Sequence, residues 1–184
     1  MKVLILILAI STFNFGLIAE NLNQREYWEN SPYDTIALSE IYYLKVSLET
    51  SKSELLLHLG EPDSIVNPKY DCGGFSEYWQ EKIFYQFFYK SLNFIGSEQE
   101  FVIERIDFTS DTTLVLEYRG HKLSYLTELN EFKELFPKSF DNKTIDPENN
   151  QILIYLLPTL ITEDMIIVTF ENGHMTELKY FTPC

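Results

Sequence analysis

Apolar residues recur along the chain at two periods, and the period of two that is typical of strands dominates. Short runs rich in aromatic and β-branched residues, separated by polar breaks, predict strands. The predicted strands are 41–48, 75–79, 83–89, 101–108, 113–118, 152–157, 165–170 and 175–181. Asn172-Gly173 lies between the last two runs, and this dipeptide is a strong signal for a hairpin turn.

A helical period appears first after residue 50. Ser51 and Glu54 match a capping box, in which each side chain bonds a free backbone N–H at the start of a helix. Leu55 and Leu59 share one face of this predicted helix. Gly60 then favours the end of the helix, because it adopts the left-handed conformation without a steric penalty.

The second predicted helix follows residue 126. Thr127 is a candidate cap, and Phe132 and Phe136 lie on the face expected to be buried. Pro137 is expected to end the helix, because its ring cannot continue the hydrogen-bond ladder. The polar segment 138–150 is predicted to be a loop.

Each predicted helix is followed by strands, which divides the chain into two similar parts. The expected fold class is α+β, with two tandem units that each pack a short helix on an antiparallel β-meander. An N-terminal arm and the first unit occupy 20–120, and the second unit occupies 121–184. A diverged duplication and two unrelated helix–meander units are both compatible with the pattern.

The segment 59–63 (Leu-Gly-Glu-Pro-Asp), between a helix and a meander rich in Tyr and Phe, resembles a known superfamily. This superfamily contains the small lipoprotein of the outer-membrane β-barrel assembly machinery and the secreted β-lactamase inhibitory proteins. The resemblance covers 50–108 and, more weakly, 124–181. It implies an exported protein without catalytic machinery, whose sheet face binds another protein. The lipoprotein's lipid-attachment cysteine is missing, and two cysteines cannot supply one disulfide to each repeat.

The first residues have the pattern of a secretory signal. Lys2 precedes the apolar run 3–10, which is too short to span a bilayer comfortably. Cleavage after Ala19 would remove a signal peptide at 1–19 and leave a chain without a transmembrane segment. An uncleaved N-terminal anchor is the alternative. The protein is therefore expected to be exported, either to a periplasm or to the medium.

The chain has two cysteines, Cys72 and Cys184. Disulfides are common in exported proteins, so these two residues are candidates for one bond. Two unpaired thiols are the alternative, because the sequence does not show whether the cysteines lie close enough to pair.

The charge balance excludes several kinds of partner. The 28 acidic and 14 basic residues give a formal net charge of −14. A nucleic acid or an anionic membrane surface attracts clustered Lys and Arg, so neither is an expected partner. The apolar content of 45% is sufficient for a folded core.

The residues that carry chemistry do not assemble into a recognisable motif. His58, His121 and His174 lack the spacing of a zinc site. The segment 141–146 has Lys and Ile where a calcium loop requires oxygen ligands. Cys72 is the one candidate nucleophile, and the adjacent Asp71 would raise its pKa. No catalytic residue, metal or cofactor is therefore expected.

The aromatic segment 84–89 is the main candidate for a binding site. On a strand, Tyr85, Phe87 and Tyr89 face one way, and Phe84, Gln86 and Phe88 face the other. One face is expected to pack on a helix, while the other needs a cover from within the chain or from a partner. The predicted aromatic anchors are Tyr78, Trp79, Tyr85, Phe87 and Tyr89.

The leading hypothesis is a non-enzymatic module that binds another envelope or secreted protein through an aromatic sheet face. An inhibitor or immunity protein is a special case of it, in which the acidic charge would suit a basic target. A carrier for a small apolar ligand or lipid, and an enzyme using Cys72, are the alternatives.

Overall fold

The computed structural model describes residues 30–68, 84–159 and 164–183, and from Tyr33 onward these residues belong to one unit. Several predictions lie outside the described residues. They are the signal peptide at 1–19, the strand at 75–79, the anchors Tyr78 and Trp79, and the cysteines Cys72 and Cys184.

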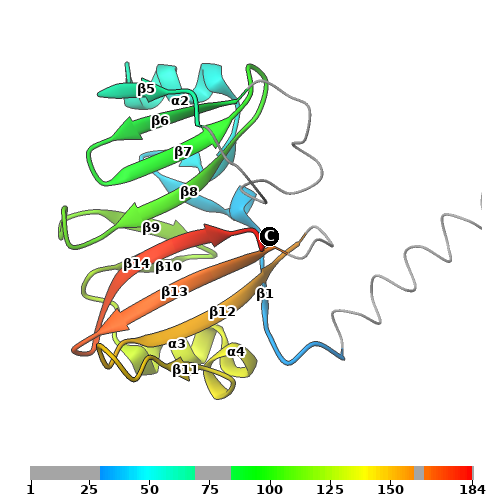
Figure 1. The fold of residues 1–184 in the computed structure, drawn as a ribbon, viewed down its shortest axis with the longest axis vertical. Coiled ribbons are helices and arrows are strands. Elements are labelled where there is room, and N and C mark those ends of the chain that lie inside the picture. Colours follow the sequence, from blue (N-terminus) through cyan, green and yellow to red (C-terminus); the bar gives the residue numbers. More distant parts are fainter. Residues whose placement is uncertain (1–29, 69–83, 160–163, 184) are drawn as a thin grey trace, which may run out of the picture. The chain divides into compact units, whose positions relative to one another are not determined.

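Ten strands of the described residues form one large mixed sheet (Figure 1). Its main path runs β1-β12-β13-β14-β8-β7-β6-β5, with β11 beside β12 and β4 beside β8. The strands are β1 (Thr35–Ile36), β4 (Glu49–Thr50), β5 (Ser64–Val66), β6 (Tyr85–Tyr89), β7 (Leu92–Gly96), β8 (Phe101–Asp107), β11 (Thr144–Ile145), β12 (Ile152–Pro158), β13 (Met165–Glu171) and β14 (His174–Phe181). All pairs are antiparallel except β1 with β12, which is parallel.

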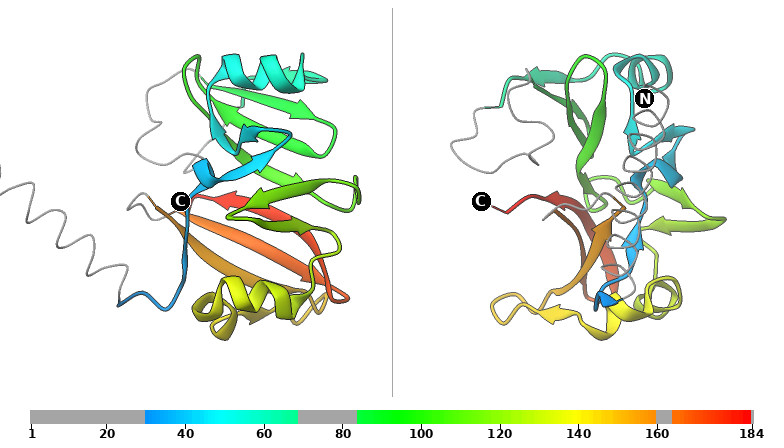
Figure 2. Two further views of the ribbon diagram at one scale, coloured as in Figure 1. Left: turned by 180° about the vertical axis from the view of Figure 1, so that it is seen from behind. Right: turned by 90° about the vertical axis from the view of Figure 1, so that its right-hand side faces the viewer.

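A smaller sheet of four strands, in the order β10-β9-β2-β3, lies on one side of the large sheet within the described part of the chain (Figure 2). Its strands are β2 (Ile41–Tyr43), β3 (Val46–Ser47), β9 (Val115–Tyr118) and β10 (His121–Ser124). On the same side lie α2 (Lys52–Leu59), α3 (Leu129–Leu135) and α4 (Pro137–Asp141), and a 3-10 turn, η1, spans Leu38–Glu40. None of the helices within the described ranges is long and apolar enough to cross a membrane.

The predicted α+β fold with two tandem helix–meander units is wrong. The protein is mostly β, and β14 pairs directly with β8, with Leu178 opposite Ile106, so both sets of strands belong to one sheet. A separate first unit would leave the edge of β8 unpaired, and an exposed row of backbone N–H and C=O groups favours strand addition. Here β14 supplies that missing neighbour.

The core lies between the large sheet and the layer of helices and short strands. Phe132 on α3 packs 5.3 Å from the ring of Phe170 on β13 and 4.8 Å from Phe136. Tyr118 on β9 stacks on Phe136 at 5.6 Å, which joins the small sheet to α3. At the other end, Leu55 of α2 is fully buried. The described core is therefore one cluster that both sheets and the helices share.

The first helix starts and ends as predicted. The Ser51 hydroxyl accepts a hydrogen bond from the Glu54 N–H, and Gly60 follows the last residue of α2 with φ +79°. The second hydrogen bond of a capping box, from the Ser51 N–H to the Glu54 carboxylate, is absent from the described part of the chain. The Glu54 carboxylate instead lies 3.3 Å from the His58 imidazole, one turn further along the helix.

The second helix differs from the prediction at both ends. Glu128 is the residue before α3, whereas the Thr127 hydroxyl accepts a hydrogen bond from the Ser124 N–H in the preceding turn. Pro137 follows the end of α3 but also starts α4, because a missing N–H costs nothing in the first turn of a helix. The predicted loop at 138–150 therefore contains part of α4 and the short strand β11.

The predicted strands from residue 83 onward are confirmed to within a few residues, including both strands of the last hairpin. Asn172 and Gly173 have φ values of +52° and +85°, and Glu171 pairs with His174 across the turn. Two consecutive left-handed residues give a turn whose twist matches that of the flanking strands.

The start of the described chain is fixed to α4 by reciprocal hydrogen bonds. The Asp34 N–H donates to the Ser139 hydroxyl at 2.8 Å, and the Ser139 N–H donates to the Asp34 carboxylate at 3.0 Å. The Leu157 N–H donates to the Asp34 carbonyl, which continues into the parallel pairing of β1 with β12. Ser139 is fully buried, so these bonds are shielded from water.

Replacing Ser139 with Ala should lower the free energy of unfolding by about 1–3 kcal/mol, because it leaves the Asp34 N–H without its acceptor. Urea unfolding followed by circular dichroism measures the change. Ser39→Ala is the matched control at an exposed serine. Equal unfolding energies for Ser139→Ala and the parent would contradict a stabilising role for this pair of bonds.

Gly96 and Gly173 should respond to alanine for different reasons. A Cβ at Gly96 would lie 2.1 Å from the Glu100 carbonyl oxygen, whereas a Cβ at Gly173 meets nothing within 4 Å and is disfavoured through its positive φ alone. Gly96→Ala should therefore cost about 3 kcal/mol or more, and Gly173→Ala about 1–2 kcal/mol. Thermal and urea unfolding of both variants tests this order. A larger loss of stability in Gly173→Ala than in Gly96→Ala would contradict it.

Candidate functional site

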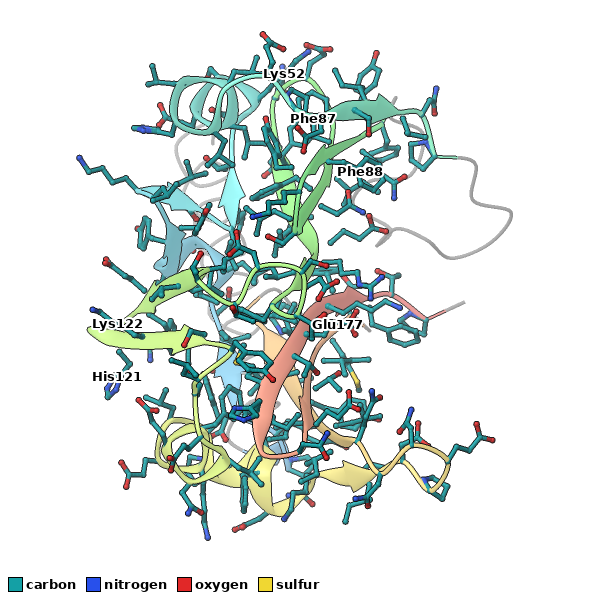
Figure 3. All side chains as sticks on the ribbon, turned by 90° about the vertical axis from the view of Figure 1, so that its left-hand side faces the viewer. Lys52, Phe87, Phe88, His121, Lys122 and Glu177 are labelled. Atoms are coloured by element: carbon teal, nitrogen blue, oxygen red, sulfur yellow. The ribbon has the colours of Figure 1, made fainter. Side chains whose placement is uncertain are left out.

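The predicted aromatic anchors on β6 face the core. The Lys52 ammonium of α2 lies 5.8 Å from the Tyr85 ring and 5.9 Å from the Phe87 ring. Phe87 is 1% exposed, and its ring packs 4.6 Å from that of Phe101. Figure 3 shows Lys52 and Phe87 together on the helix side of β6, with Phe88 on the other side.

This placement removes Phe87 from any exposed binding surface and leaves only one edge of Tyr89 accessible. Tyr89 is 9% exposed, and its hydroxyl donates to the Gly60 carbonyl at the end of α2. Alternate positions on β6 are aromatic on both faces, so the residue pattern did not reveal which face would meet the helix. Of the five predicted anchors, Tyr78 and Trp79 lie outside the described residues, and Tyr85 is half-buried on the core side.

The opposite face of the large sheet carries a continuous cross-strand row. The pairing registers place its members side by side from β12 to β6, and they are Tyr155, Ile167, Lys179, Arg105, Asn93 and Phe88. Met165 and Phe181 form the next pair along β13 and β14. We call these eight residues the open face. In Figure 1 this face is turned toward the viewer, and no described helix or strand lies in front of β12, β13 or β14.

Burial separates the two sides of the same strands. Ile166 and Leu178, which point into the core, are fully buried. Of their neighbours on the other face, Ile167 is half-buried and Lys179 is exposed. Phe181 is 40% exposed, a large value for a phenylalanine in a paired strand. The strands β12 and β13 are therefore apolar on both faces, whereas β14 carries Glu177 and Lys179 beside Phe181 on the open face. The described helices cover only the other face, although the Tyr33 ring lies 6.0 Å from the Tyr155 ring.

The far end of this sheet face is more polar. The Glu104 carboxylate accepts hydrogen bonds from the amides of Gln86 at 2.7 Å and Asn93 at 2.6 Å. The Asn93 side-chain carbonyl is buried and has no hydrogen-bond partner among the described residues. An unsatisfied acceptor of this kind costs free energy and can be relieved by an incoming donor.

The charged residues in the middle of the open face are basic, although the protein as a whole is acidic. Arg105 forms an ion pair with Glu177 on β14, and Figure 3 shows Glu177 on this strand. Lys179 is exposed and forms no ion pair with any residue that the structure describes. The apolar part of the open face, on β12 and β13, is therefore bordered by charged residues on β14 and β8, and polar borders around apolar areas are found in many protein–protein interfaces.

Asp107 ends β8 at the border of this face. Burial would raise its pKa, but hydrogen bonds from the hydroxyls and N–H groups of Ser110 and Thr109 outweigh that effect and lower the pKa to about 2. The carboxylate thereby holds the loop that follows β8. Its own loop stabilises the ionised form, which makes Asp107 a structural group and a poor proton donor at neutral pH.

The Asp107 carboxylate should stabilise the fold only above acidic pH. A lowered pKa means that its contribution is complete above the unfolded value of 3.8 and is lost as the pH falls through about 2. Asp107→Asn should therefore be less stable than the parent at pH 7, and this difference should vanish near pH 2. Urea unfolding at pH 7, 4 and 2 measures it, with Asp141→Asn, at an exposed aspartate of α4, as control. A difference that does not depend on pH would contradict the charge-based explanation.

Neither the histidines nor the acidic loop joins a metal-binding cluster among the residues that the structure describes. Within the described residues, no group of three or more His, Cys, Asp or Glu side chains is arranged to hold an ion. His174 stacks on Tyr125 at 4.6 Å, which is a packing role. The segment 141–146 is divided between the end of α4 and the strand β11.

One feature of the sequence does indicate the open face. The run Ile-Leu-Ile-Tyr-Leu-Leu at 152–157 is continuously apolar, and a strand of this kind is apolar on both faces. Strand 83–89 is more aromatic, but its large side chains on one face pack on α2. Tyr155, Ile167 and Phe181 were thus missed as candidates, since exposure depends on where the helices pack.

Searches for known relatives give no further guidance, because no family model, curated protein or solved structure matches the chain.

Proposed function

We propose that this protein is a non-enzymatic binding module of the cell envelope or the extracellular space, and that it binds another protein through the open face. The observation that carries the proposal is the apolar area of Tyr155, Ile167, Met165 and Phe181, which pairs across three strands and which the described helices leave uncovered. Export rests on the signal-like pattern of residues 1–19, and the superfamily resemblance remains a prediction.

The shape and chemistry of the open face support this function better than the alternatives. A carrier for a lipid or small apolar ligand usually encloses its ligand in an apolar cavity. The open face is instead a broad strand surface with Lys179 and the Arg105–Glu177 ion pair beside its apolar part. An inhibitor or immunity protein would use the same kind of surface, so it remains a special case of the proposal.

A charge placed in the open face should weaken binding strongly. Ile167→Lys puts an ammonium group in the centre of the apolar area, and losing a central anchor typically costs about 2 kcal/mol or more, which is about thirtyfold in affinity. Val115→Lys is the matched control, because Val115 is 38% exposed on a strand of the other sheet. Affinity capture from envelope extract and culture medium, with the tagged protein and both variants, tests the proposal.

The expected result is a stoichiometric partner that the parent and Val115→Lys retain and that Ile167→Lys loses. Circular dichroism melts establish that both variants are folded. A partner retained equally by the two variants would contradict the open face as the binding site. If an unrelated acidic protein captures the same set of proteins, specific binding itself is contradicted.

A further inference from the structure

A cavity lies at the end of α2, away from the open face. Its volume is about 250 Å³, it is open to solvent, and it is lined by the β2–β3 turn, the segment after α2, the β6–β7 turn and the loop containing Asp111. Sites for small-molecule ligands usually measure about 300–1,000 Å³. This cavity therefore has room for a single side chain or a small ion-bearing group, but not for a lipid.

The walls of the cavity combine apolar and aromatic surface. Leu59 and Leu92 contribute aliphatic side chains, and Tyr43 and Tyr89 contribute rings. Leu44 forms part of the rim and is 63% exposed at the tip of a hairpin. Such walls suit the aliphatic stem of a long polar side chain, and the rings add an attraction for a cation.

The charges in the cavity are mainly negative. Glu61, Asp63 and Asp111 line it, together with Lys90 and His58. The Lys90 ammonium is 2.9 Å from the Asp111 carboxylate, and the Lys90 backbone N–H donates to the Asp63 carboxylate. The end of α2 adds the partial negative charge of a helix C-terminus.

Glu61 is the carboxylate that is available for an incoming cation. It accepts no hydrogen bond and forms no ion pair with the residues that the structure describes, whereas Asp63 and Asp111 are both engaged. Its charge also acts on the cavity wall. Burial, with a further effect of the Glu61 charge, raises the pKa of Tyr89 to about 12. Glu61 is exposed, so its carboxylate is accessible to an incoming cation.

We infer that this cavity binds one lysine or arginine side chain of a protein partner, with the stem between Leu44 and the tyrosine rings and the cationic group beside Glu61. The inference rests on the proposed protein-binding function for the source of the side chain. It concerns a different surface, however, so the two proposals can fail independently.

The test uses blocked amino acids as probes of the isolated cavity. N-acetyl-arginine amide and N-acetyl-lysine amide are titrated into the full ¹⁵N-labelled chain, and the backbone resonances of Leu44 and Ser91 report binding. N-acetyl-citrulline amide has nearly the shape of the arginine probe without its charge. Saturable shifts with both cationic probes, and none with citrulline amide, are expected.

Variants assign the binding to Glu61. Glu61→Gln should weaken the binding of the arginine probe by about two- to fivefold, the range expected for one partly exposed ion pair. Glu134→Gln makes the same change at an exposed position on α3 and should have no effect. Lys90→Met removes the resident cation and should tighten binding. Thermal melts confirm that each variant is folded.

Three results would overturn the inference. They are the absence of saturable shifts at the cavity, equal binding of citrulline amide, and equal weakening by Glu61→Gln and Glu134→Gln. Putrescine distinguishes a free amine from a protein side chain, because tighter binding of putrescine than of the arginine probe would reject the protein source. None of these results depends on Ile167→Lys, so they leave the open face as a separate question.

Discussion

The pairing of β14 with β8 is the interaction on which the rest of the structure depends. It places Leu178 opposite Ile106 in the core and Lys179 opposite Arg105 on the other side. Without it, the chain would form two small sheets, each with an exposed edge and a thin core. With it, Tyr155 at one end and Phe88 at the other belong to one row, and the apolar side chains of both sets of strands form one core. The same backbone hydrogen bonds therefore create both the core and the continuous open face.

Local features of this fold were predictable because the residues that specify them are neighbours in sequence. Asn172-Gly173 defines its own turn, and Ser51 and Gly60 mark the ends of α2 through their own backbone conformations. Pairing between distant strands has no such local signal, since the edges of β8 and β14 look the same in sequence whichever neighbour they receive. The sequence also could not show which face of β6 packs on a helix, because both of its faces are apolar.

The sequence placed the candidate binding face on β6, whereas the described helices leave a different apolar area uncovered. The apolar residues of this area, Tyr155, Ile167, Met165 and Phe181, lie on β12, β13 and the end of β14. The helices decide between the faces: α2 packs on the side of Phe87, and α3 packs on the side of Phe170. Both helices lie on the same side of one sheet, so the face that remains open is determined by how the whole sheet assembles.

The reciprocal hydrogen bonds between Asp34 and Ser139 have a consequence for folding. Its two residues are 105 positions apart, and the adjoining strand β1 pairs with β12, still later in the chain. A chain synthesised from its N-terminus therefore has to wait for most of its length before this edge can close. Contacts of high sequence separation slow folding, and until β1 pairs with it, the end of β12 at Leu157 and Pro158 presents an unpaired edge. The interval before closure is thus the period in which this chain is most exposed to association with other chains.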